Sequence, residues 1–338
     1  AVNSGNCHAR EVMDDVIARA VAVEPSLNAF ALLDCEAACA AADDLDRRIA
    51  AGETPGPLAG VPFSVKDLVA TRGMETAYGS HIFAGHVPQE DAEAVARLRR
   101  AGAILIGKTN TPEFGHKALT NNPRHGYTRN PWMPASSLDG AGSARIPASA
   151  CGVLGLKPTM GLVPNETAIE LFSTFINLGL NARNADDLAV GLTAIAGPCA
   201  DDPWTMNAPA RDYRPSREPL AGLDGLRILV FKRMGKRLLD RDVERLLDGA
   251  LQSLASAGAR IEEGPEDFDW AKPTAFAAMR AYQRARLERY CEEWQDRMDP
   301  SLVRALEQGR QQDLLALQSV PAERSELFRR VQSLFDSH

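Results

Sequence analysis

A serine that follows a glycine-rich run is the first feature of this sequence that could do chemistry. The run Gly140-Ala141-Gly142-Ser143 has almost no side-chain bulk, so its successive backbone N–H groups can converge on one point. Converging donors of this kind stabilise the oxyanion that forms when a hydroxyl attacks a carbonyl. The run predicts a hydrolytic site with Ser143 as nucleophile, although an isolated Gly-x-Gly-Ser is more often an ordinary turn.

The hydroxyl needs a base, and Lys66 is the candidate. A serine hydroxyl is nearly inert at neutral pH, and the usual base is a histidine oriented by a carboxylate. The six histidines form no such motif, and a Gly-x-Ser-x-Gly elbow is absent. Lys66 follows the apolar run Val61–Val65, where desolvation favours the neutral form of a lysine and lets it accept a proton. The alternative is a solvated surface lysine.

Alternating strands and helices must position these two residues. Pro25 is expected to end the first helix, and Asp34 and Asn184 are expected to cap later ones. This alternation predicts an α/β fold with a mixed, mostly parallel central sheet covered by helices on both faces. Strands are predicted at 28–33, 61–65, 103–106, 152–156, 226–231 and 259–263, and helices at 9–24, 34–51, 91–100, 185–195, 240–257 and beyond 273.

Three ordered blocks extend the pattern beyond a single motif. They are GVPFSVKD, EDAEAVARLRRAGAILIGKTNTPEFG and DGAGSARIPASACGVLGLKPT, between about residues 56 and 197. Together they resemble the amidase signature family of serine hydrolases, and TNTPEFGHKALTNNPRHGYTRNPW resembles the family's free-standing amidases. The resemblance implies the amidase signature fold. It also implies hydrolysis of a carboxylic acid amide to an acid and ammonia or an amine, through a Ser–cis-Ser–Lys triad and an acyl-enzyme.

The resemblance also assigns roles residue by residue. It makes Ser143 the nucleophile and Lys66 the base, and it places Arg145 and Asp139 behind the loop that carries the serine. No metal and no cofactor is implied. The backbone N–H groups that would form the oxyanion hole and bind the substrate belong to Gly140, Ala141, Gly142 and Ser143.

The third triad member is where the chain departs from the family. Members carry a Gly-Gly-Ser-Ser-Gly-Gly stretch well before the nucleophile, whereas NPWMPASSLDGAGS runs from Asn130 straight to Ser143. Ser136 is the candidate for the cis-serine that relays the proton, or it is an unrelated small residue beside a gap. Either disordered loop residues are missing from the sequence as written, which the intact flanking blocks favour, or the chain carries a deletion and is expected to be inactive.

A second motif matches a pattern that is typical of nucleotide binding. Gly102–Thr109, GAILIGKT, satisfies the P-loop expression G-x-x-x-x-G-K-[ST]. A phosphate-binding loop follows a strand and opens a helix, but here the four central residues are apolar and a helix is predicted before the motif. We therefore interpret the motif as a buried strand, with Lys108 outside the catalytic machinery.

We expect a single amidase domain over residues 1–338. Residues 1–55 form an N-terminal helical layer, 56–197 the amidase signature core, and 198–338 a C-terminal α/β and helical part. That last part is expected to be incomplete, because LFRRVQSLFDSH resembles the family's LF-x-x-YD helix without the strand and proline-rich loop that normally follow.

The composition bounds the function further. With 45% hydrophobic and 25% charged residues the chain is typical of a soluble globular protein. The net charge of -7, without a basic stripe, argues against direct binding of nucleic acid. No apolar run is long enough to cross a membrane, and no signal peptide opens the chain. The six scattered cysteines predict reduced thiols and a cytoplasmic location.

The expected partner is a small-molecule amide. No contact with a membrane is expected, and a homodimer stays open. Two other functions stay open as well. One is the A-type subunit of an amidotransferase that acts on misacylated transfer RNA together with a tRNA-binding partner. The other is a catalytically degenerate binding scaffold, since the Gly-Ser stretch is missing.

Overall fold

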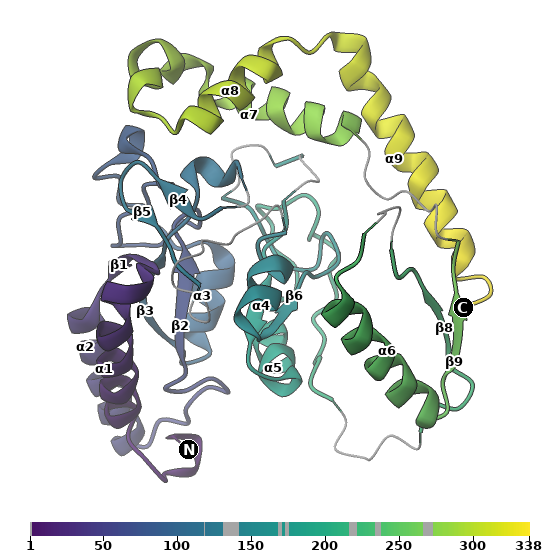
Figure 1. The fold of residues 1–338 in the computed structure, drawn as a ribbon. Helices are drawn as coiled ribbons and strands as arrows, with labels where there is room; N and C mark the ends of the chain where they lie inside the picture. Colours follow the sequence, from purple (N-terminus) through teal and green to yellow (C-terminus); the bar gives the residue numbers. More distant parts are fainter. Residues whose placement is uncertain are drawn as a thin grey trace. The chain divides into compact units, whose positions relative to one another are not determined.

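A computed structural model of the chain describes residues 2–117, 119–130, 142–167, 171–172, 176–215, 222–233, 238–265 and 273–338. The chain divides into two compact units (Figure 1). Unit 1 consists of Ala1–Pro215 and Glu288–Arg304, and unit 2 of Ser216–Leu287 and Ala305–His338. The expectation of a single domain stays a prediction.

A three-stranded sheet in unit 1 carries the candidate base. Its strands are β1 (Phe30–Leu33), β2 (Pro62–Lys66) and β3 (Ile104–Thr109), and β3 lies in the middle. β3 runs parallel to β2 and antiparallel to β1. Because parallel neighbours need a crossover connection, the chain passes through helix α3 (Glu93–Arg100) between β2 and β3. The predicted strand at the P-loop-like motif is confirmed, and it is buried along almost its whole length.

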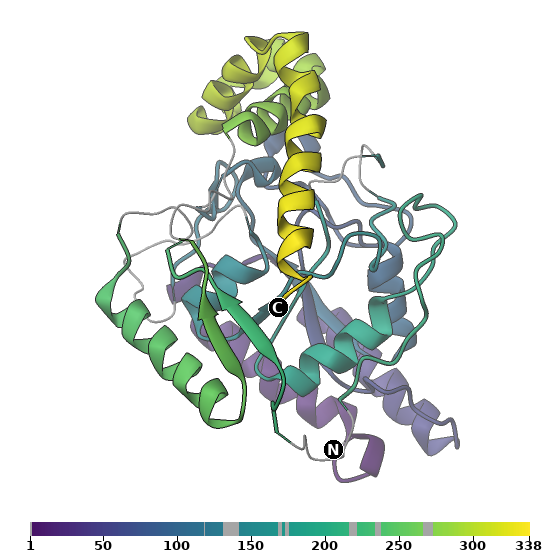
Figure 2. The same ribbon diagram turned by 90° about the vertical axis from the view of Figure 1, so that its right-hand side faces the viewer.

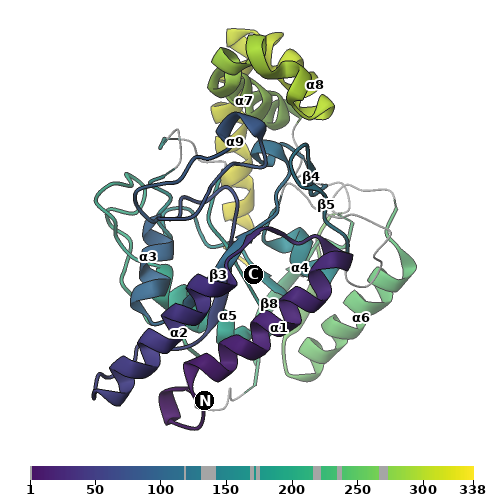
Figure 3. The same ribbon diagram turned by 90° about the vertical axis from the view of Figure 1, so that its left-hand side faces the viewer.

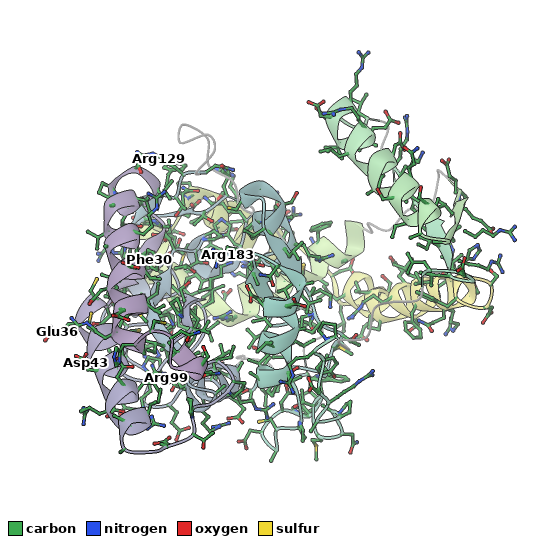
Figure 4. All side chains as sticks on the ribbon, turned by 90° about the horizontal axis from the view of Figure 1, so that it is seen from below. Phe30, Glu36, Asp43, Arg99, Arg129 and Arg183 are labelled. Carbon is green, nitrogen blue, oxygen red and sulfur yellow. The ribbon has the colours of Figure 1, made fainter. Side chains whose placement is uncertain are left out.

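Two helices cover one face of this sheet. Helices α1 (Ala9–Leu27) and α2 (Cys35–Ala50) lie side by side against the strands (Figure 3). α2 follows the predicted cap, because the Asp34 side chain accepts the backbone N–H of Ala37. Its inner side is formed by small and apolar residues that pack with β3, whereas Glu36 and Asp43 lie on the outer side (Figure 4). The amphipathic pattern of the sequence thus sets which face of α2 is buried.

The prediction that Pro25 ends the first helix is wrong. α1 continues to Leu27 and ends at Asn28, whose left-handed conformation (φ 52°) lets its N–H bond to the Glu24 carbonyl. The Glu24 carboxylate then accepts the next two backbone N–H groups, from Ala29 and Phe30, at 3.0 Å each. The helix therefore ends at the left-handed Asn28 and not at the proline, and the Glu24 carboxylate replaces helical carbonyls as acceptor for the next N–H groups.

The other elements between residues 1 and 215 of unit 1 are short. Helix α5 (Ala185–Ile195) begins at the predicted cap Asn184, whose side chain accepts the N–H of Asp187. α5 packs with α3 through a small apolar cluster. Strands β4, β5 and β7 and helix α4 were not predicted. The bounds are β4 (Asn121–Asn122), β5 (Gly126–Tyr127), α4 (Arg145–Cys151), β6 (Leu154–Leu156) and β7 (Leu180–Ala182), with 3₁₀ turns at Val2–Ser4, His81–Phe83, Glu113–Gly115 and Gln295–Arg297.

Arg97 joins α3 to the end of α5, and its loss is expected to destabilise unit 1. Its guanidinium donates to the four carbonyls of residues 195–198 at 2.7–3.2 Å and is also paired with Glu93. We expect Arg97→Met to lower the free energy of unfolding by about 2 kcal/mol or more, because three partly buried carbonyls lose a charged donor. Urea unfolding measures this. Arg100→Met, which removes a more exposed contact to the same Glu93, is the control and should cost less than about 1 kcal/mol.

Unit 2 contains a small parallel sheet. Strands β8 (Arg227–Val230) and β9 (Arg260–Glu263) pair in parallel, and helix α6 (Arg241–Ser256) connects them beside the sheet (Figure 2). The three elements match their predictions, and the structure adds a cap at Asp240, whose side chain accepts the N–H of Asp242. The chain beyond Pro273 is helical as predicted, in α7 (Pro273–Trp294), α8 (Pro300–Arg310) and α9 (Leu314–Leu334). None of the helices in the described residues is long and apolar enough to pass through a bilayer.

Candidate active site

The structure brings Lys66 and Ser143 together. Lys66 is the last residue of β2, paired with Thr109 of β3, and Ser143 lies just before α4. The Lys66 Nζ lies 3.1 Å from the Ser143 Oγ, although the two residues are 77 positions apart in the sequence. Ser143 is exposed and Lys66 is partly buried. An exposed hydroxyl in contact with a partly buried amine is the arrangement that a nucleophile and its base require.

The turn that carries Ser143 depends on glycine at position 142. Gly142 adopts φ 148°, and its carbonyl accepts the N–H groups of Arg145 at 2.7 Å and Ile146 at 3.0 Å. A Cβ on Gly142 would come 3.1 Å from the Ile146 side chain. A larger residue would therefore be both strained and crowded at this position. The small residues of the motif thus place the hydroxyl at the start of α4.

Several predicted site residues lie outside the described part of the chain. These are Ser136, Gly140, Ala141 and Asp139, so only Gly142 and Ser143 of the expected oxyanion hole are described. The Arg145 side chain makes no hydrogen bond or ion pair within the described residues. Both explanations of the short stretch before Ser143, omitted loop residues and a deletion, concern positions outside the described part and stay predictions.

A buried carboxylate follows the candidate base directly. Asp67 is only 2% exposed and accepts the backbone N–H groups of Ala77 and Gly79, each at 2.9 Å. Burial raises the pKa of Asp67, and these two N–H groups oppose that shift. Asp67 thus ties the loop after β2 to the end of the strand. No sequence motif assigns a role to Asp67, but a charged residue at the end of an apolar strand is a signal of burial.

Lys108, from the P-loop-like motif, is buried and forms hydrogen bonds with the same loop after β2. Its side chain is fully buried and donates to the Val69 carbonyl and to the hydroxyls of Thr71 (2.8 Å) and Thr76 (3.0 Å). Burial lowers the pKa of Lys108 to about 8, against the attraction of nearby Asp67. The amine is enclosed by the loop after β2 and is not directed at a ligand, which agrees with its exclusion from the catalytic machinery.

The shifted pKa of Lys108 makes stability depend on pH. The pKa of Lys108 is about 8 in the folded chain and has its ordinary value of 10.5 in the unfolded chain. At pH values between these two, the unfolded chain binds more protons than the folded chain, so the free energy of unfolding rises with pH. The full rise across this window is about 3 kcal/mol. Urea unfolding just below and well above pH 8 should show this rise in the wild type and not in Lys108→Met. An equal rise in both proteins would assign it to other groups.

A second buried carboxyl anchors the loop that follows β3. Glu113 is fully buried and accepts the Ser80 hydroxyl and the backbone N–H of Asp299, both at 2.6 Å. Burial raises the pKa of Glu113 and lowers that of the adjacent His116. His116 contacts the Ser301 hydroxyl at 2.7 Å. This network, which the sequence analysis did not single out, connects residues 113–116 to the segment 299–301 within unit 1.

The comparisons with known proteins decide the family. The family model described as Amidase matches residues 11–138 and 135–330. The chain belongs to the amidase family. The two matched segments overlap at residues 135–138, where the sequence lacks the Gly-Ser stretch that the resemblance leads one to expect. The resemblance to amidase signature enzymes is thereby confirmed, and with it the α/β fold.

Relatives of this chain carry different names. The A subunit of the glutamyl-tRNA(Gln) amidotransferase of Cyanothece sp. is 34% identical over 83% of this chain and 63% of its own length. An acylamidase of Rhodococcus erythropolis is 34% identical over 81% of this chain and 61% of its own length. The solved structure of 6-aminohexanoate cyclic dimer hydrolase with substrate aligns with a TM-score of 0.85 at 26% identity, over 99% of this chain and 75% of that chain. The chain spans about three fifths of the length of the two curated relatives.

Proposed function

We propose that this amidase hydrolyses a carboxylic acid amide to an acid and ammonia or an amine, with Ser143 as nucleophile and Lys66 as base. The observation that carries the proposal is the 3.1 Å contact between the Lys66 amine and the Ser143 hydroxyl. The family membership supports the reaction class, and the exposed hydroxyl supports access for a substrate. A free-standing amidase in the cytoplasm, with its six free thiols reduced, is part of the same proposal.

The geometry supports a short proton path. A neutral Lys66 takes the proton of Ser143 while the Oγ attacks the amide carbonyl. Backbone N–H groups of residues 140–143 donate hydrogen bonds that stabilise the negative charge on the carbonyl oxygen. The protonated Lys66 then returns the proton to the leaving nitrogen, and water hydrolyses the acyl-enzyme. Ser136 stays the proposed third member of the triad, as the hydroxyl through which the proton can pass from Ser143 to Lys66.

A fluorophosphonate probe tests the nucleophile before any substrate is known. We expect it to label Ser143 in the folded wild type, with the labelled peptide identified by mass spectrometry, because only an activated serine reacts with such probes. Heat-unfolded protein is the control and should remain unlabelled. Absence of label on the folded chain would instead support the degenerate binding scaffold.

The amidotransferase subunit is the second candidate. It is favoured by the identity of 34% to the Cyanothece protein over 83% of this chain. A subunit of that kind acts with a tRNA-binding partner, whereas a free-standing amidase does not. Purification of the protein from native extract distinguishes the two, because a stoichiometric partner would favour the amidotransferase and a homogeneous single chain with amidase activity would favour the amidase.

A further inference from the structure

An asparagine side chain reaches the turn that carries the candidate nucleophile. Asn181 is the middle residue of β7 and is paired with Gly155 of β6. Cross-strand partners place their side chains on the same face of a sheet, and a Cβ on Gly155 would come 2.7 Å from the Ala148 side chain in α4. The face of the sheet that carries Asn181 is therefore the one against which α4 packs.

The neighbour of Asn181 in β7 anchors the strand from the other face. Leu180 packs against the apolar cluster that contains Leu192 and Ile195 of α5, and successive side chains of a strand point to opposite faces. β7 is therefore fixed to α5 on one face and directs Asn181 toward α4 on the other. The Asn181 side chain is exposed, so it contributes to this packing through its amide and not through apolar burial.

The Asn181 amide donates to the backbone of Ala144. The positions of its nitrogen and oxygen are assigned from their neighbours. With the nitrogen toward the Ala144 and Leu180 carbonyls, the amide donates to them at 2.8 Å and 3.0 Å, whereas the opposite assignment would place its oxygen against acceptors alone. The N–H of Ala148 reaches the same Ala144 carbonyl at 3.4 Å. The shorter hydrogen bond to this carbonyl therefore comes from β7 and not from the helix itself.

Ala144 is the residue directly after the candidate nucleophile. On the other side of Ser143, the Gly142 carbonyl accepts the N–H groups of residues 145 and 146, at the start of α4. The turn around Ser143 is thus held by one carbonyl bonded within α4 and by another bonded to β7. The distance of 3.1 Å between the Ser143 Oγ and the Lys66 Nζ depends on this turn, and a shift of about 1 Å would remove the contact.

We propose that Asn181 is a positioning residue for the proposed hydrolysis, because its amide holds the Ala144 carbonyl and thereby keeps the Ser143 hydroxyl within reach of Lys66. Asn181 acts through the backbone and transfers no proton itself. The inference rests on the proposed function, since it gives Asn181 a task in the same proton transfer. Loss of the amide should therefore slow the attack of the hydroxyl and leave the binding of a ligand unchanged.

The fluorophosphonate probe tests this inference. Labelling of Ser143 at a series of probe concentrations gives a maximal rate and a half-saturating concentration. We expect Asn181→Leu, which is similar in size but has no donor, to reduce the maximal rate by about tenfold or more and to leave the half-saturating concentration unchanged. Asn181→Asp has the same shape and should lose at least as much, because a carboxylate cannot donate to a carbonyl. A wild-type maximal rate in either variant, or an effect confined to the half-saturating concentration, would overturn the inference.

A second asparagine of the same segment provides the matched control. The Asn184 side chain caps α5 by accepting the N–H of Asp187 at 2.8 Å. Asn184→Ala should lower the midpoint of urea unfolding and leave the labelling rate of Ser143 unchanged. Equal slowing in Asn184→Ala and Asn181→Leu, at an equal loss of stability, would make the role of Asn181 structural only. Circular dichroism checks that each variant is folded, and if Asn181→Leu unfolds, the isosteric Asn181→Asp decides the outcome.

The same experiment separates this inference from the proposed function. Labelling of Ser143 at one rate in the wild type and in both Asn181 variants would refute the positioning role and keep the proposed function. A folded wild type that is not labelled at Ser143 and hydrolyses no amide would refute the proposed function, and the positioning role with it.

Discussion

Ser143→Ala is expected to reduce amide hydrolysis by about 10³-fold or more, because it removes the atom that attacks the carbonyl. The assay is ammonia release from a panel of amides of graded acyl length, which also identifies the acyl group that the site accepts. The effect should appear in kcat and not in KM, since the substrate still binds beside an alanine. The fold should be unchanged, because Ser143 is exposed.

Ser149→Ala is the matched control for that variant. Ser149 is an exposed serine of the same helix, α4, and its loss should leave the rate unchanged. Full amidase activity in Ser143→Ala would falsify the assignment of the nucleophile. It would also remove the reason to assign a base to Lys66.

Lys66→Met should reduce kcat by about 10²- to 10⁴-fold, the usual contribution of a general base. Methionine keeps much of the length of the side chain but cannot accept the Ser143 proton. In the wild type the rate should fall as the pH is lowered, because a protonated amine cannot act as a base. Kinetics across a pH series in both proteins measure this, and the acidic decline should be absent from any residual activity of the variant.

Lys232→Met serves as the control for the loss of a lysine. Lys232 is paired with Asp248 and Glu263 in unit 2, so its removal changes a surface ion pair and should leave the pH profile of hydrolysis unchanged. A Lys66→Met variant with the wild-type rate and profile would require a different base. Ser136→Ala then becomes the next variant to examine, with a smaller loss expected because Lys66 contacts Ser143 directly.

Elements with local signals could be predicted from the sequence. Helix α5 begins at Asn184 and α2 follows Asp34, because a capping side chain and an amphipathic pattern are both local properties. The apolar residues at the centre of the P-loop-like motif also predict the strand that the structure shows as β3. Lys66 and Ser143 were chosen from their motifs, and the structure brings them into contact.

Features that depend on distant contacts could not be predicted in this way. Helix α4 is short, contains Pro147 and packs against Gly155, so its small residues do not form an amphipathic pattern. The burial of Asp67 depends on a loop ten residues further along the chain that supplies its N–H donors. The contact between Glu113 and the backbone of Asp299 spans 186 positions. Such pairings are set by tertiary packing, which a single sequence does not display.

The adjacency of Lys66 and Asp67 limits which changes in the length of β2 this chain can accommodate. Successive residues of an extended chain point to opposite sides, so one side chain reaches Ser143 while its neighbour enters the cradle formed by the N–H groups of Ala77 and Gly79. An insertion or deletion of a single residue in β2 would exchange the two. An acid would then face the hydroxyl, and an amine would face donors that it cannot satisfy. The proposed activity therefore depends on the number of residues in this strand as much as on the lysine itself, because a change by one residue turns the wrong side chain toward Ser143.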